Sequence, residues 1–230
     1  MWVVSAQQRF ARAVEASIQE YLDEREAALT EIAADATALL RLVREMVAGG
    51  KRVRSAFVLW GWHAVTAARP DASHTTGTEQ DPGWADVVGI ATAMELFHAA
   101  ALVHDDIIDR DLVRHGKPNI AGRYQKLYGA LSTSDVSHYA LSTALLGGDL
   151  LLMSAYEMIT TAPVSSDTRI LAVSYINQAL FTVAGGELID TDAVLYPISK
   201  TNPHTVAAHK TAVLDQGNFQ SILRRRQRGH

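Results

Sequence analysis

Three aspartates lie at the end of an apolar segment that runs from Glu95 to Asp109. Asp105 and Asp109 are four residues apart, and Asp106 precedes Asp109 by three. On a helix both spacings place side chains on one face, where like charges repel unless a cation neutralises them. A cluster of hard oxygen donors favours a divalent cation such as Mg²⁺. The alternative is a solvated helix end, but carboxylates at the C-terminal end of a helix oppose its dipole.

Cations gather in a second segment, Gly49-Gly50-Lys51-Arg52-Val53-Arg54, which precedes the apolar run. Its two glycines lead into a predicted helix start, where backbone N–H groups and the helix dipole favour an anion. Lys51 and Arg54 are three residues apart and can share a face, so both could bind the same anionic group. Basic residues after glycine are also common at helix borders without a ligand, so this segment alone is weakly specific.

A third segment, residues 110–118, follows the aspartates and mixes acidic and basic residues. Such a mixture suits a polyphosphate held partly through Mg²⁺ and partly by cationic hydrogen bonds, although ordinary surface ion pairs would give the same pattern. The order of basic loop, carboxylate helix end and basic loop is more specific than any one part. It predicts two anionic groups and metal ions above an apolar helix, which suits a substrate with a polar head and an apolar tail.

These motifs, in this order, resemble those of a trans-prenyltransferase of the polyprenyl diphosphate synthase family. GGKRVR resembles the family's GGKRxRP, with Ser55 in place of the proline, and ELFHAAALVHDDIID resembles the helix that carries the DDxxD motif. RDLVRHGKP resembles the segment after it, LLGGDLLL the GD-containing helix, and GGELID the GQxLD segment. His209-Lys210-Thr211 resembles the family's lysine–threonine pair, so the resemblance runs from about residue 45 to about residue 213.

The resemblance implies one site for isopentenyl diphosphate and one for an allylic prenyl diphosphate. Lys51, Arg54 and His98 would hold the diphosphate of isopentenyl diphosphate. A further contact, usually made by arginine in this family, falls to His115, whose side chain is only partly charged at neutral pH.

The same resemblance assigns the allylic diphosphate to the aspartates and to the segments around them. Asp105 and Asp109, together with Asp106, would bind the cofactor Mg²⁺, which bridges to the allylic diphosphate. The remaining contacts to this diphosphate would come from three residues: Arg114, Lys210 and Thr211.

The reaction implied by the resemblance is a prenyl transfer in isoprenoid biosynthesis. Diphosphate leaves the allylic substrate, the double bond of isopentenyl diphosphate attacks the resulting cation, and a proton is lost. Below Asp105 on the helix, Ala101 leaves room, while Phe97 and Met94 lie deeper and Phe97 could form a floor. By resemblance to the family, in which residues at these positions limit chain length, the arrangement implies a product longer than farnesyl diphosphate, such as geranylgeranyl diphosphate.

Two other functions compete with this one. A terpene cyclase also carries a DDxxD cluster, but GGKRVR would then have no second diphosphate to bind. A catalytically inactive family member could instead bind and regulate an intact synthase. Co-purification with a full-length synthase would distinguish that role from catalysis.

Helical periodicity dominates the chain and predicts an all-α fold, which the resemblance identifies as an isoprenoid synthase-type helical bundle. Asp167 is the expected N-cap of one helix, and residues 190–203 are an expected loop. The predicted helices cover about 5–48, 51–68, 84–109, 120–161, 168–188 and 204–214. We expect one helical domain over residues 1–214, followed by a basic, disordered tail over residues 215–230.

The family pattern includes a second aspartate-rich motif, FQxxDDxxD, well downstream of the lysine–threonine pair. This sequence has no such motif, and only nineteen residues follow Thr211. We therefore expect a bundle that is incomplete at its C-terminus, at most a weak diphosphate site, and little or no turnover. The arginine-rich tail has the character of a frameshift or a truncated reading frame.

Amino-acid composition narrows the possible classes of function and location. A net charge of −4 does not favour nucleic-acid binding, and the lack of cysteine excludes disulfides and thiolate metal sites. The first residues lack the pattern of a signal peptide. The best candidate for a membrane span, around residues 140–156, is interrupted by Gly147, Gly148 and Asp149. We expect a cytoplasmic homodimer that has neither a membrane span nor a nucleic-acid partner.

Overall fold

A computed structural model of the chain describes residues 2–66, 83–131 and 133–195. Within these ranges the short 3-10 helix η1 (Ala34–Ala36) follows the first helix, and strands β1 (Val113–Arg114) and β2 (Lys117–Pro118) pair antiparallel. The α-helices of this part of the chain are α1 (Trp2–Ile32), α2 (Thr37–Val47), α3 (Val53–Thr66), α4 (Trp84–Ile108), α5 (Ile120–Tyr128), α6 (Thr133–Thr161) and α7 (Ser166–Leu195). The all-α prediction is confirmed.

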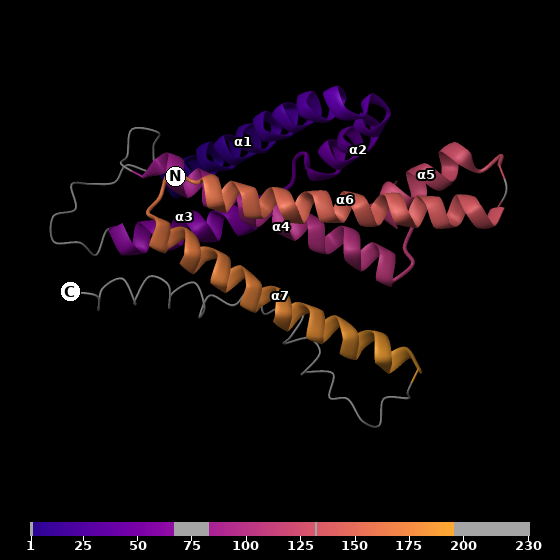
Figure 1. Ribbon diagram of the computed structural model, residues 1–230. Coiled ribbons are helices and arrows are strands. Elements are labelled where there is room, and N and C mark those ends of the chain that lie inside the picture. Colours follow the sequence, from indigo (N-terminus) through magenta and orange to yellow (C-terminus); the bar gives the residue numbers. More distant parts are fainter. Residues whose placement is uncertain (1, 67–82, 132, 196–230) are drawn as a thin grey trace.

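Helix α4 lies in the middle of the bundle, where it contacts α1, α2, α3 and α6. Figure 1 shows α4 and α6 crossing the centre of the molecule, with α1 and α2 on one side and α7 on the other. By length and composition alone α4 could also cross a membrane, but most of it is buried inside the bundle. The prediction that residues 140–156 are the best candidate for a membrane span was wrong. Among the described helices, α4 is long and apolar enough to cross a membrane, and that segment is not.

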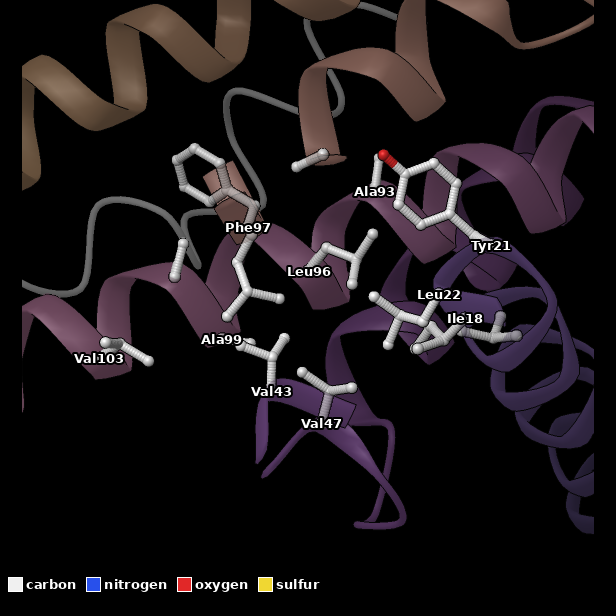
Figure 2. Packing of buried hydrophobic residues seen from close by; sticks show 14 of the residues in the cluster. Ile18, Tyr21, Leu22, Val43, Val47, Ala93, Leu96, Phe97, Ala99 and Val103 are labelled. Atoms are coloured by element: carbon white, nitrogen blue, oxygen red, sulfur yellow. The ribbon is translucent and has the colours of Figure 1, made fainter. Parts of the chain in front are cut away.

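The apolar stripes of α1 and α2 converge on α4 and form the core. In Figure 2, Ile18 and Leu22 of α1 lie beside Leu96 of α4, with Val43 and Val47 of α2 close by. All five belong to one cluster of buried apolar side chains. Burial of these side chains is the main force that holds α4, and therefore its aspartates, in place.

The predicted helix over residues 5–48 is in fact two helices with a turn between them. Ala33 leaves the helical region with φ −156° and ψ 86°, and Thr37 Oγ1 donates to the carbonyl of Ala34 at 2.7 Å. The fold back lets the apolar stripes of both helices reach the same core. Alanine-rich sequence on both sides of the turn favours helix throughout, so propensity alone did not reveal the break.

Other boundaries also differ from the predictions. The expected helix over 120–161 is divided into α5 and α6. Helix α7 is capped by Ser165, whose Oγ accepts from the Thr168 N–H at 3.2 Å, and not by Asp167. The same helix continues through residues 190–195, which were expected to be a loop. The helix predicted over 204–214, the domain end at 214 and the basic tail lie outside the described residues and stay predictions.

A glycine pair in α6 allows this helix to approach its neighbours closely, with Gly148 against α4 and Gly147 against α2 and α5. A Cβ atom at Gly148 would lie 2.4 Å from Nε2 of His104, and one at Gly147 would lie 3.0 Å from Cδ1 of Ile120. His104 immediately precedes Asp105 on α4. Packing against Gly148 therefore fixes the end of α4 that carries the aspartates.

Candidate functional site

The three predicted aspartates differ in exposure at the end of α4. Asp109 is the C-cap residue, and its N–H donates to the carbonyl of Asp105 at 2.8 Å, so these two are one helical turn apart. Asp109 is exposed, whereas the side chain of Asp105 is 34% exposed and that of Asp106 only 5%. Asp105 and Asp109 can thus face a ligand in solvent, while Asp106 is buried.

Arg114 supplies a positive charge to this cluster. Its Nη2 lies 2.9 Å from Oδ2 of Asp105, and its Nε donates to Oδ1 of Asp106 at 2.6 Å. The hydrogen bond to Asp106 is the largest cause that raises the pKa of Arg114 above its usual value. His115 and Gly116 turn the chain with φ 52° and 76°, which folds the β1–β2 hairpin so that Arg114 reaches both carboxylates. The guanidinium of Arg114 therefore offsets part of the repulsion between the carboxylates. The sequence analysis had assigned that neutralisation to a metal ion alone.

The loop that joins α2 to α3 carries Lys51, and the first turn of α3 carries Arg54. Gly49, Gly50 and Arg52 have φ 74°, 97° and 47°, so three of its residues adopt the left-handed region. Among the described residues, neither Lys51 nor Arg54 forms a salt bridge, and Lys51 is exposed. Burial lowers the pKa of Arg54, and the charge of Glu95 partly offsets that effect. Lys51 and Arg54 are therefore available to bind an anion.

His98 lies on α4, seven residues before Asp105. Burial lowers its pKa to about 4, and the positive charges of Arg54 and Arg114 add to this effect. The imidazole is consequently neutral at physiological pH and can donate one hydrogen bond and accept another. It could bind a phosphate oxygen as a hydrogen-bond donor, while the charge comes from the arginines.

These side chains line one pocket of about 720 Å³, a volume within the range of small-ligand sites. Its walls are formed by the end of α2, the α2–α3 loop, the start of α3, α4, the β1–β2 hairpin and the start of α5. The predicted site residues that line it are Lys51, Arg54, His98, Asp106, Arg114 and His115. Asp105 and Asp109 do not line this pocket, so the structure separates a basic pocket from the exposed carboxylate pair.

Three further cations line the pocket without a role assigned by the sequence analysis: Arg52, Lys117 and Arg123. Lys117 lies in the β1–β2 hairpin, within a segment whose mixed charges were noted. Arg123 comes from α5 and also pairs with Glu45, with Nη2 2.5 Å from Oε2. No motif marked Arg123, because only the packing of α5 brings it to the pocket. Lys210 and Thr211 lie outside the described residues, so their predicted roles stay predictions.

The donor set at the end of α4 is compatible with Mg²⁺ shared with a substrate. Asp105 and Asp109 offer carboxylate oxygens one turn apart, and Mg²⁺ in proteins is commonly held by one or two carboxylates plus substrate phosphates. Within the described ranges, no group of three acidic or histidine side chains is arranged to hold a metal by itself. The pair therefore fits a cation that a bound diphosphate helps to coordinate.

Comparison with known proteins places these features in a family. The sequence model of the polyprenyl synthetase family matches residues 36–223, which include the α2–α3 loop, the aspartates and the lysine–threonine pair. A short chain isoprenyl diphosphate synthase of Methanothermobacter thermautotrophicus is 33% identical over 143 residues, covering 61% of this chain and 34% of that protein. Heterodimeric geranylgeranyl pyrophosphate synthase large subunit 2 of Arabidopsis thaliana is 30% identical over 131 residues. The match covers 54% of this chain and 31% of the Arabidopsis protein.

The fold matches solved structures as well. A geranylgeranyl pyrophosphate synthase from Corynebacterium glutamicum, crystallised with isoprenyl diphosphate and magnesium, superposes with a TM-score of 0.76 at 23% identity. The match covers 94% of this chain and 59% of that structure. The similarity confirms the predicted helical-bundle fold, and the chain spans about a third of the length of the two curated relatives.

Proposed function

We propose that this chain, which belongs to the polyprenyl synthetase family, joins isopentenyl diphosphate to an allylic prenyl diphosphate in isoprenoid biosynthesis. The observation that carries the proposal is the pocket in which the loop cations, His98 and Arg114 meet beside the exposed carboxylate pair. That arrangement offers separate places for two diphosphates, one held by cations and one held at carboxylates.

The basic pocket would hold isopentenyl diphosphate. Lys51 and Arg54 would donate charged hydrogen bonds to its phosphate oxygens, which are stronger than neutral ones. Neutral His98 would donate a further hydrogen bond from the α4 side of the pocket. His115, Lys117 and Arg123 extend the lining, so Lys117 and Arg123 add positive charge near the histidine that stands where the family usually has arginine.

The allylic diphosphate would lie at the end of α4. Asp105 and Asp109 would hold Mg²⁺, which when bound neutralises the diphosphate as it leaves. Arg114 would exchange part of its contact with Asp105 for a phosphate oxygen, and Asp106 would keep the guanidinium in place. Lys210 and Thr211 would approach the same diphosphate from the other side.

The reaction needs no nucleophilic side chain. The allylic carbon–oxygen bond breaks, and the double bond of isopentenyl diphosphate forms the new carbon–carbon bond. The departing diphosphate takes the proton that is then lost. The role of the residues is to orient both substrates and to stabilise negative charge on the leaving group.

The apolar side of α4 would receive the growing product. Ala101 and Met94 stay partly exposed on the stripe that leads from Asp105, whereas Phe97 is 2% exposed and belongs to the core. The small side chain of Ala101 would let the product pass the first turn. We propose geranylgeranyl diphosphate or a similar polyprenyl diphosphate as the product.

Regulatory binding to another synthase is the second candidate function. It is supported by similarity to a relative whose name describes a heterodimer subunit. A terpene cyclase is less favoured, because such an enzyme would have no use for the second, cationic pocket.

We further propose that the chain acts as a cytoplasmic homodimer.

Incubation with Mg²⁺, isopentenyl diphosphate and farnesyl diphosphate, followed by analysis of product length, tests the proposal. A product longer than farnesyl diphosphate that is lost in the Asp105→Asn, Asp109→Asn double variant would support the proposal. Absence of product from the wild-type chain would remove catalysis and favour the regulatory role, which co-purification with a longer synthase would then test.

A further inference from the structure

Arg52 of the α2–α3 loop also lines the pocket, but its guanidinium contacts protein groups. Its side chain is 8% exposed, and its backbone adopts φ 47°, which is unfavourable for a residue with a Cβ atom. Nη2 donates to the carbonyl of Val47 at 2.6 Å, and Nη1 lies 3.3 Å from Oε2 of Glu95. Its Nε donates to Oε2 of Glu15 at 3.1 Å, and Nη2 contacts the same oxygen. The guanidinium therefore ties the loop to α1, α2 and α4 at once.

Glu15 on α1 holds this loop at two points. Besides Arg52, it accepts a hydrogen bond from the backbone N–H of Gly49, with N to Oε2 at 3.2 Å. Gln19, one turn further along α1, also donates to Glu15 and fixes its carboxylate. Gly49 and Arg52 flank Lys51 on either side, so Glu15 fixes the backbone that presents Lys51.

Glu95 on α4 holds the opposite side of the loop. Its Oε1 accepts from the backbone N–H of Ser55 at 3.0 Å, and the Ser55 hydroxyl donates to the carbonyl of Arg52 at 2.8 Å. Arg54 lies between these two anchored residues. Glu95 is three residues before His98 on the same helix, so the clamp and one pocket residue share a rigid support.

From this geometry we infer that Glu15 is a positioning residue for the diphosphate pocket, acting through Arg52 to preset the backbone of Lys51 and Arg54. The inference rests on the proposed binding of isopentenyl diphosphate to this pocket. A preset loop does not have to lose conformational entropy when the ligand binds, so affinity depends on the clamp. Glu15 lies before residue 36, where the family match begins, so the motif pattern does not assign it a role.

The test compares Glu15→Gln with Glu20→Gln, an exposed glutamate on the same helix. Binding of isopentenyl diphosphate without Mg²⁺, and of farnesyl diphosphate with Mg²⁺, is measured by calorimetry on the full chain. We expect E15Q to weaken isopentenyl diphosphate binding roughly tenfold, while farnesyl diphosphate binding and both affinities of E20Q match the wild type. Arg52→Lys, which keeps the charge but loses the forked geometry, should weaken isopentenyl diphosphate binding similarly.

Three outcomes would overturn parts of this reasoning. If E15Q binds isopentenyl diphosphate as tightly as the wild-type chain does, the positioning role is refuted. If E15Q does not fold, wild-type affinity in R52K refutes it instead. Equal loss of both ligands in E15Q would show a general structural defect and would also refute it. Failure of the wild-type chain to bind isopentenyl diphosphate would instead refute the proposed function on which the inference rests.

Discussion

Replacing Arg114 by glutamine should destabilise the fold even without substrate. The side chain of Asp106 is 5% exposed, and Arg114 is its charged partner. Breaking a fully buried ion pair by removing one partner costs about 3–5 kcal/mol, whereas an exposed pair contributes up to about 1 kcal/mol. Because Arg114 itself is 24% exposed, we expect a loss of about 2–3 kcal/mol in the free energy of unfolding. For a domain of this size that corresponds to a fall in Tm of roughly 4–12 °C.

Urea unfolding followed by far-UV circular dichroism measures this loss. Arg110→Gln is the matched control, since Arg110 is exposed in the same segment and, like Arg114, is an arginine. Asp106→Asn combined with R114Q should recover most of the stability, because the buried carboxylate is then neutral. Equal stability of R114Q and wild type, or additive losses in the double variant, would refute the view that Arg114 compensates Asp106.

The same variant tests how Arg114 and a metal share the carboxylates. Arg114 contacts Asp105 through Nη2, so it competes with a cation in the absence of diphosphate. R114Q should therefore bind Mn²⁺, used as a spectroscopic probe for Mg²⁺, more tightly than the wild-type chain does. Weaker Mn²⁺ binding in R114Q would show that Arg114 organises the carboxylates for the metal.

Three further predictions follow from neighbouring residues. His98 has a folded-state pKa of about 4, below its usual value of about 6.5, so between these pH values the unfolded chain binds more protons than the folded one. The free energy of unfolding should therefore fall as the pH drops from about 6.5 to 4. His98→Gln should reduce this pH dependence, measured as the midpoint of urea unfolding at each pH. Gly148→Ala would place a Cβ 2.4 Å from His104 and should cost about 1–3 kcal/mol in urea unfolding, whereas Gly185→Ala, which meets open space, should not destabilise the protein. Ala101→Phe should shorten the product, and an unchanged product length would contradict the proposed path along α4.

The sequence predicted the parts of the site that depend on local spacing. The aspartates at the end of α4, Lys51 in the α2–α3 loop and Arg54 at the start of α3 lie where helical periodicity and the glycines place them. The pairing of Arg114 with Asp105 and Asp106 was not predicted, because it depends on the left-handed turn at His115 and Gly116. Spacing along a helix indicates which charges repel, but the turn of the hairpin that follows α4 decides which cation compensates them.

The clamp around the loop could not be read from the sequence for a similar reason. Glu15 and Arg52 are 37 residues apart, and they meet only because η1 folds α2 back along α1. The sequence analysis treated residues 5–48 as one helix, which would have kept Glu15 far from the loop. Arg123 reaches the pocket in the same way, through packing of α5 that no motif announces.

The most direct test of the central claim is the affinity of the full chain for isopentenyl diphosphate without Mg²⁺, measured by calorimetry. The basic pocket is separate from the exposed carboxylates, so the wild-type chain should bind saturably, and Asp109→Ala should bind equally well. Arg54→Ala should weaken binding at least about tenfold, because a charged hydrogen bond to the diphosphate is worth about 1.5–3 kcal/mol. No saturable binding by the wild type, or unchanged affinity in R54A, would contradict the account.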